Sequence, residues 1–147
     1  MTATPPPPSE RPTKKSDWTH PSIVEVVSIL HPFYTKRHIT VFPVIAITWD
    51  ISGFSPVLNA SEVESVFDVP LEMFLKNENR REEKVELMGD RFLVHYFDYV
   101  TENICYTIWA LTASILIEAA SIIYERLPPI EEQKPKFWSR SRHLNME

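Results

Sequence analysis

The chain has 147 residues, of which 44% are hydrophobic, so it can form one domain with a buried core. Its formal net charge of −5 provides no basic surface for nucleic acid, and its two glycines exclude a glycine-rich phosphate loop. The single cysteine, Cys105, excludes an internal disulfide and suits a reducing compartment.

Residues 1–20 are rich in proline, with a run of four at 5–8. We expect a disordered or polyproline-II arm, either a solvated tail or a ligand for an SH3-like groove. No apolar signal peptide begins the chain, and the longest apolar run has Glu118 near its middle, which argues against a membrane span. The expectation is an intracellular, by default cytoplasmic, protein with no membrane partner.

Two segments in the first half have the composition of strands. Residues 23–30 are rich in Val and Ile and are bounded by prolines. Residues 39–50 are apolar on both faces, which predicts a strand in the middle of a core, with an irregularity at Pro43 because proline has no amide donor. Residues 50–61 are predicted to form a loop.

The next segment contains shorter elements. Asn59 followed by Glu62 is a variant of the capping box and predicts a short helix or turn. We predict a brief strand at 66–70, a short helix at 71–76 that begins just after a proline, and a charged linker at 77–83.

A β-hairpin is predicted from 84–88 and 91–100, joined by a turn at Gly89–Asp90, with a further strand at 104–107. His95 falls in the central strand of this prediction. We interpret it as a hydrogen-bonded structural histidine and not a ligand, since no second ligand lies at metal spacing. Cys105 has no basic neighbour and is predicted to be a buried thiol.

Residues 108–126 predict a long helix, mostly buried against a sheet and ended by two prolines. Its polar residues recur at helical spacing and predict one narrow solvent-facing stripe, made of Ser114, Glu118, Ser121 and Glu125. Residues 131–147 form a polar tail in which Phe137 and Trp138 are expected to pin the chain to the folded body.

The run "RREEKVELMG" at 80–89 invites comparison with the Nudix box, G-x5-E-x7-R-E-U-x-E-E-x-G-U, where U is a large apolar residue. In that motif carboxylates on one helix face gather Mg²⁺ against a diphosphate. With Arg81 and Glu82 placed on the Arg-Glu pair, Val85 falls on the first paired Glu and Met88 on the Gly. Neither glycine of the chain has Glu six residues later. The run is therefore not the box.

Other runs resemble the part of the coenzyme A diphosphatase-type Nudix hydrolases that follows the box. They are "NASEVESVFDVPLEMFLKNENRREE", "GDRFLVHYFDY", "IWALTASILIEAASIIYERLP" and "KPKFW". The resemblance implies an α/β class, namely a truncated Nudix-like α/β/α sandwich with a mixed sheet and a long C-terminal helix. Residues 21–130 would form this partial domain. Where the family has its box, this chain has "PPPPSERPTKKSDWTH", so we expect a chain that starts inside the box or whose box has been replaced.

The resemblance also implies cleavage of the pyrophosphate of coenzyme A, or of related nucleotide diphosphate derivatives, with Mg²⁺ or Mn²⁺. None of the family's metal-ligand Glu residues has a match here, so no catalytic or metal-binding residue is assigned. We expect no bound metal and no hydrolysis by the chain alone. The alternative is a non-catalytic interaction or oligomerisation module, including a homo-oligomer. A mitochondrial location is implied for the full-length family form.

Four residues remain as candidates for substrate binding. Glu62 and Glu64 lie beside a loop and are interpreted either as an auxiliary base or outer metal ligand, or as a helix cap and a solvated carboxylate. Arg80 and Arg81 suit the geometry of a 3′-phosphate, and the alternative is a solvated ion-pair cluster with the neighbouring glutamates.

Overall fold

The computed structural model describes residues 24–139, which form two compact units. Unit 1 consists of residues 24–30 and 44–66, and unit 2 consists of residues 31–43 and 67–139. The proline-rich arm predicted at 1–20, and residues 140–147 of the predicted tail, lie outside the described residues. Within 24–139, no helix combines the length and apolar character that a membrane crossing needs.

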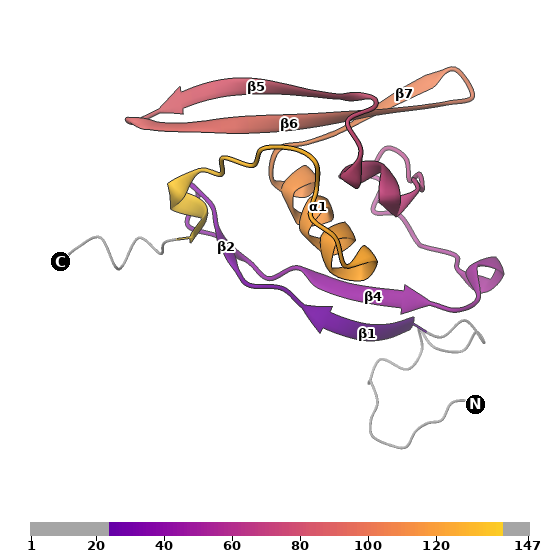
Figure 1. Ribbon diagram of the computed structural model, residues 1–147. Coiled ribbons are helices and arrows are strands. Elements are labelled where there is room, and N and C mark those ends of the chain that lie inside the picture. The colour runs from indigo at the N-terminus through magenta and orange to yellow at the C-terminus, as the bar shows by residue number, and fades with distance from the viewer. Residues whose placement is uncertain (1–23, 140–147) are drawn as a thin grey trace. The chain divides into compact units, whose positions relative to one another are not determined.

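Unit 1 is built on a two-stranded antiparallel sheet (Figure 1). Strand β1 (Val24–Ile29) pairs with β4 (Val44–Thr48), and both are rich in the β-branched residues that favour extended backbone. The strand predicted at 23–30 is confirmed, whereas the strand predicted at 39–50 is divided at Pro43, with a short strand before it and β4 directly after it. The prediction of a strand in the middle of a core was wrong, since β1 is the only strand paired with β4 in the described part of the chain.

The remainder of unit 1 is loop and turn. A short 3₁₀ helix, η2 (Ile51–Gly53), is capped by Asp50, whose side chain accepts from the Ser52 amide. A turn follows at Asn59, whose carbonyl accepts from the amide of Glu62 at 2.9 Å. The predicted strand at 66–70, where the two units meet in sequence, was wrong: that segment contains no strand.

Unit 2 contains a three-stranded antiparallel sheet in the order β5-β6-β7, with β5 (Arg80–Leu87), β6 (Asp90–Thr101) and β7 (Ile104–Trp109). The predicted hairpin is confirmed, but its turn residues are Met88 and Gly89, with φ of 53° and 80°. Two consecutive positive φ values match the type I′ turn, whose twist suits a hairpin.

The predicted linker at 77–83 was wrong in its second half, because β5 already begins at Arg80. The strand lies at the edge of the sheet, where its side chains reach solvent and charges are tolerated. The predicted burial of Cys105 in β7 was also wrong, since its side chain is exposed.

Helix α1 (Ala110–Tyr124) packs on this sheet and on the 3₁₀ helix η3 (Leu71–Leu75), which confirms the short helix predicted after Pro70. Together these elements bury one hydrophobic cluster: Phe74, Leu75, Phe97, Ile108, Ala113, Ile117 and Ala120. The rings of Phe74 and Phe97 meet edge to face at 4.9 Å. The α/β class with a C-terminal helix is thus confirmed.

Two details of α1 differ from the prediction. The helix starts at Ala110, since the two preceding residues complete β7. Ser114 is only 4% exposed, so the predicted solvent-facing stripe was wrong at that position.

The end of the described chain folds back onto unit 2, as predicted for Phe137 and Trp138. The ring of Phe137, in η4 (Lys136–Ser139), meets Phe92 of β6 edge to face at 6.2 Å. Trp138 meets Phe33 in the same way at 5.7 Å. Phe33 belongs to a small hairpin of β2 (Phe33–Tyr34) and β3 (Thr40–Val41).

Candidate functional site

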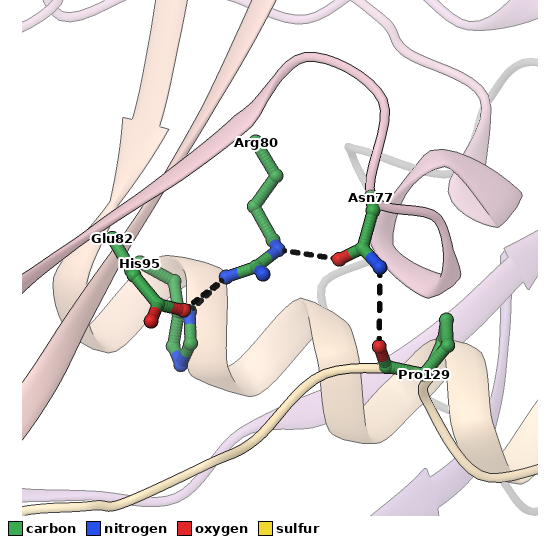
Figure 2. A network of polar contacts seen from close by, with 5 residues as sticks. All are labelled: Asn77, Arg80, Glu82, His95 and Pro129. Atoms are coloured by element: carbon green, nitrogen blue, oxygen red, sulfur yellow. Dashed lines mark hydrogen bonds and ion pairs between the residues drawn. The ribbon is translucent and has the colours of Figure 1, made fainter.

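A polar network surrounds the guanidinium group of Arg80 at the start of β5 (Figure 2). Its Nη1 donates to Oε1 of Glu82 at 2.8 Å and contacts Nδ1 of His95 at 3.0 Å. Its Nε donates to Oδ1 of Asn77 at 2.9 Å, and Asn77 donates in turn to the carbonyl of Pro129 at 3.2 Å. The network therefore joins two strands to the loop before β5 and to the segment after α1.

His95 is a structural histidine in the central strand β6, and its residue is 3% exposed. Because arginine has only donors, Nδ1 of His95 must accept from Arg80, which leaves the proton on Nε2. Burial is the main cause that lowers the pKa of His95, the Arg80 charge lowers it further, and Glu82 opposes both. The predicted hydrogen bond of His95 is confirmed at Nδ1, whereas its Nε2 is buried without a hydrogen-bond partner among the described residues.

The positive charge of Arg80 is balanced by a carboxylate within the network. Its side chain is 14% exposed and lies against the carboxylate of Glu82, whose pKa is lowered chiefly by this hydrogen bond. The ion pair holds Arg80 in place on the same sheet face as Phe97, the residue opposite it in the ladder.

Arg81 lies on the opposite face of the strand, since successive side chains alternate. Its Nε and Nη2 donate to the two carboxylate oxygens of Asp98 at 3.0 and 3.3 Å, and its guanidinium lies 4.5 Å from the centre of the Tyr96 ring. Thr107 also donates to Asp98, at 2.7 Å, and these hydrogen bonds lower the pKa of that carboxyl. The structure thus does not bring Arg80 and Arg81 to a common phosphate position.

Glu82 and Glu83 also lie on opposite faces of β5. Glu82 is held by Arg80 on one face, whereas Glu83 accepts from the hydroxyl of Tyr96 at 2.8 Å on the other. Successive side chains of a strand point to opposite faces, so the adjacent Glu82 and Glu83 cannot bind one ion together, and this run does not fit a Mg²⁺ or Mn²⁺ site. Across residues 24–139, no three His, Cys, Asp or Glu side chains are grouped closely enough to hold a metal ion.

The other two candidates, Glu62 and Glu64, belong to unit 1, and both are exposed. The side chain of Asn59 caps this turn by accepting from the amide and hydroxyl of Ser61, at 3.3 and 2.8 Å. Glu62 contributes its amide to the turn through the Asn59 carbonyl.

Sequence reasoning missed several residues that these contacts involve, above all Asn77, Tyr96 and Asp98. The signal that could have identified the partners on β6 is the cross-strand register of β5 and β6. Once the turn is placed at Met88–Gly89, Glu82 stands opposite His95 and Arg81 opposite Tyr96.

No model of a protein family matches the chain, but comparison with known proteins gives several relatives. The chain is 57% identical over 117 residues to Nudix hydrolase 15, mitochondrial, of Arabidopsis thaliana, which covers 80% of the chain and 41% of the relative. It is 52% identical over 115 residues to Nudix hydrolase 22, chloroplastic, of the same plant, covering 78% of the chain and 38% of the relative.

A third relative is the peroxisomal coenzyme A diphosphatase NUDT7 of Mus musculus. It is 33% identical over 111 residues, which covers 74% of the chain and 46% of the relative. The chain therefore spans less than half the length of each of these relatives. Over the part that it spans, the chain is thus similar to Nudix hydrolases, at 57% and 52% identity to the two plant relatives.

Proposed function

We propose that this chain carries part of a coenzyme A diphosphatase-type Nudix hydrolase, and that its 147 residues alone do not hydrolyse a diphosphate. The observation that carries the second half is the geometry of β5. The run that resembles the Nudix box is a strand in which Glu82 and Glu83 face opposite sides and are bound by Arg80 and Tyr96, respectively.

A divalent metal supplies such a reaction with charge neutralisation at the diphosphate oxygens and with an activated water. The described carboxylates do not fit that role, so no step of hydrolysis is assigned to a residue of this chain. In this proposal the metal ligands of the family, for Mg²⁺ or Mn²⁺, come from residues without counterpart here.

Coenzyme A as the substrate class is supported by the mouse relative, whose name states that activity. The names of the two plant relatives give no substrate, and their identity to the chain is higher. The same names refer to mitochondria, chloroplasts and peroxisomes, which supports an intracellular location. Residues 21–130 are proposed as the partial Nudix-like domain.

The first half of the proposal is tested with a chimera. The 117 matched residues of Nudix hydrolase 15 are replaced by their counterparts from this chain, and formation of 4′-phosphopantetheine from coenzyme A is followed by mass spectrometry with Mn²⁺. We expect metal-dependent product from the chimera. A folded chimera that leaves coenzyme A intact, while the mouse enzyme cleaves it in the same buffer, would refute the coenzyme A assignment.

The second half is tested with the 147-residue chain in the same assay. We expect no product above the metal-only control, with circular dichroism showing that the chain is folded. Turnover that chelation abolishes would contradict it.

A further inference from the structure

Part of one edge of strand β6 is covered by a later segment of the chain and not by a strand. β6 pairs with β7 only over residues 96–101, so residues 90–95 have no strand partner on that side among residues 24–139. Residues 130–139, here called the strap, bind this stretch. The Leu93 amide donates to the Gln133 carbonyl at 2.8 Å, and the Gln133 side-chain amide donates to the carbonyl of Arg91 at 3.1 Å. One strap residue thus satisfies both an edge donor and an edge acceptor.

Three further contacts fix the strap. The Lys136 amide donates to Oδ2 of Asp90 at 2.7 Å, and the aromatic contacts of Phe137 and Trp138 follow directly. Figure 1 shows the strap running from α1 back to η4, near the turn between β5 and β6. The strap is thus attached at both its middle and its end.

Glu132, beside Gln133, has its carboxyl group in a place that disfavours the charged form. Its Oε2 is buried and has no hydrogen-bond partner among the described residues. Two charged groups act on it: Glu118 of α1, which itself lies 3.5 Å from Nε2 of His31, and Lys134 of the strap. Burial is the main cause that raises the pKa of Glu132, Lys134 lowers it, and Glu118 raises it again. The attached strap therefore favours the protonated carboxyl.

We propose that the strap is a proton-controlled latch on the open edge of β6, held while Glu132 is protonated and loosened when that carboxyl releases its proton to solvent. Loosening frees the Leu93 amide and the Arg91 carbonyl. An edge with free donors and acceptors can pair with another extended segment, so the latch would control access to that edge.

The direction with pH follows from linkage. A carboxyl whose pKa is higher in the attached state favours attachment at low pH. That contribution is lost as pH rises from the ordinary value of 4.5 through the raised pKa. Glutamine at the same position keeps a neutral side chain of similar shape, and so removes the titration.

Amide hydrogen exchange by NMR tests the latch on the whole chain, as protection factors of Leu93 and Lys136 from about pH 4 to about pH 8. Amides of β6 residues 96–101 report the stability of the sheet itself. In the wild type we expect Leu93 protection to fall with rising pH, about tenfold for each unit by which the Glu132 pKa is raised. In Glu132→Gln it stays level, and Glu131→Gln, a change at an exposed neighbour, follows the wild type.

Two results would overturn the proposal. One is the same fall in Glu132→Gln as in the wild type. The other is a fall that residues 96–101 share equally, because pH would then act on the whole sheet and not on the strap.

Discussion

The guanidinium of Arg80 contacts Nδ1 of His95 at 3.0 Å and thereby fastens the edge strand β5 to the central strand β6 through a largely buried contact. The next residue, Arg81, points to the other face and binds Asp98. The run at 80–89 looks like a metal-binding motif in the sequence, but in the structure its arginines hold the strands of the sheet together.

Replacing Arg80 is expected to weaken the fold. Arg80→Ala removes donors to three partners and leaves Nδ1 of His95 buried without one, for a cost of about 2 kcal/mol in the free energy of unfolding. Urea denaturation followed by circular dichroism measures this. Lys84→Ala, at an exposed position of the same strand, is the control and is expected to change little. Equal effects of both variants would show that the network adds no stability.

The lowered pKa of His95 predicts a pH dependence of stability. The folded state disfavours the protonated ring, so the unfolded state binds more protons below the ordinary value of 6.5. Stability contributed by this residue is complete above that pH and is lost as pH falls toward the folded pKa. Urea midpoints measured between about pH 5 and about pH 8 should show this slope in the wild type and a smaller one in His95→Gln.

The control for this measurement is His38→Asn, since His38 is exposed and asparagine tolerates its positive φ of 65°. A slope that survives in His95→Gln and disappears in His38→Asn would assign the effect to the wrong histidine and contradict the prediction.

Ala110 offers a stabilising substitution. It has a φ of 59° at the junction of β7 and α1, a conformation in which a Cβ atom is unfavourable. Ala110→Gly is expected to raise the melting temperature, with a gain of about 1 kcal/mol from relieved strain that the greater freedom of the unfolded chain partly offsets. Ala119→Gly, within the same helix, should lower stability by about 1 kcal/mol or more. Destabilisation by both changes would show that Ala110 is not strained.

Much of the fold could be predicted where local pattern and tertiary role agree. The strand at 23–30, the part of 39–50 that forms β4, the hairpin and the final helix follow from β-branched composition, turn residues and helical periodicity. The start of β5 could not, because a charged run looks like a linker unless its place at a sheet edge is known. Ser114 was misplaced because it lies on the buried face of the helix beside Ala113 and Ile117, whereas apolar residues such as Ile122 and Ile123 are exposed, so polarity alone did not mark the solvent-facing side.

The polar contacts of the site were harder to predict from the sequence than the strands and helices. Arg80, Arg81 and His95 were recognised as residues of interest, but their partners depend on the cross-strand register. A hairpin turn placed one residue later shifts every cross-strand partner by two residues, so Glu82 would be paired with Phe97 instead of His95. The Asn77 contact with the Pro129 carbonyl joins segments 52 residues apart, and no local pattern indicates it.

Calorimetric titration of Mn²⁺ into the folded 147-residue chain shows whether β5 binds metal. Metal binding is what a Nudix box provides, and the side chains of β5 do not fit it. We predict no saturable binding, and the same trace from Glu82→Gln and Glu83→Gln. A saturable site that either substitution abolishes would contradict the account, since it would mean that the glutamates of "RREEKVELMG" gather a metal ion after all.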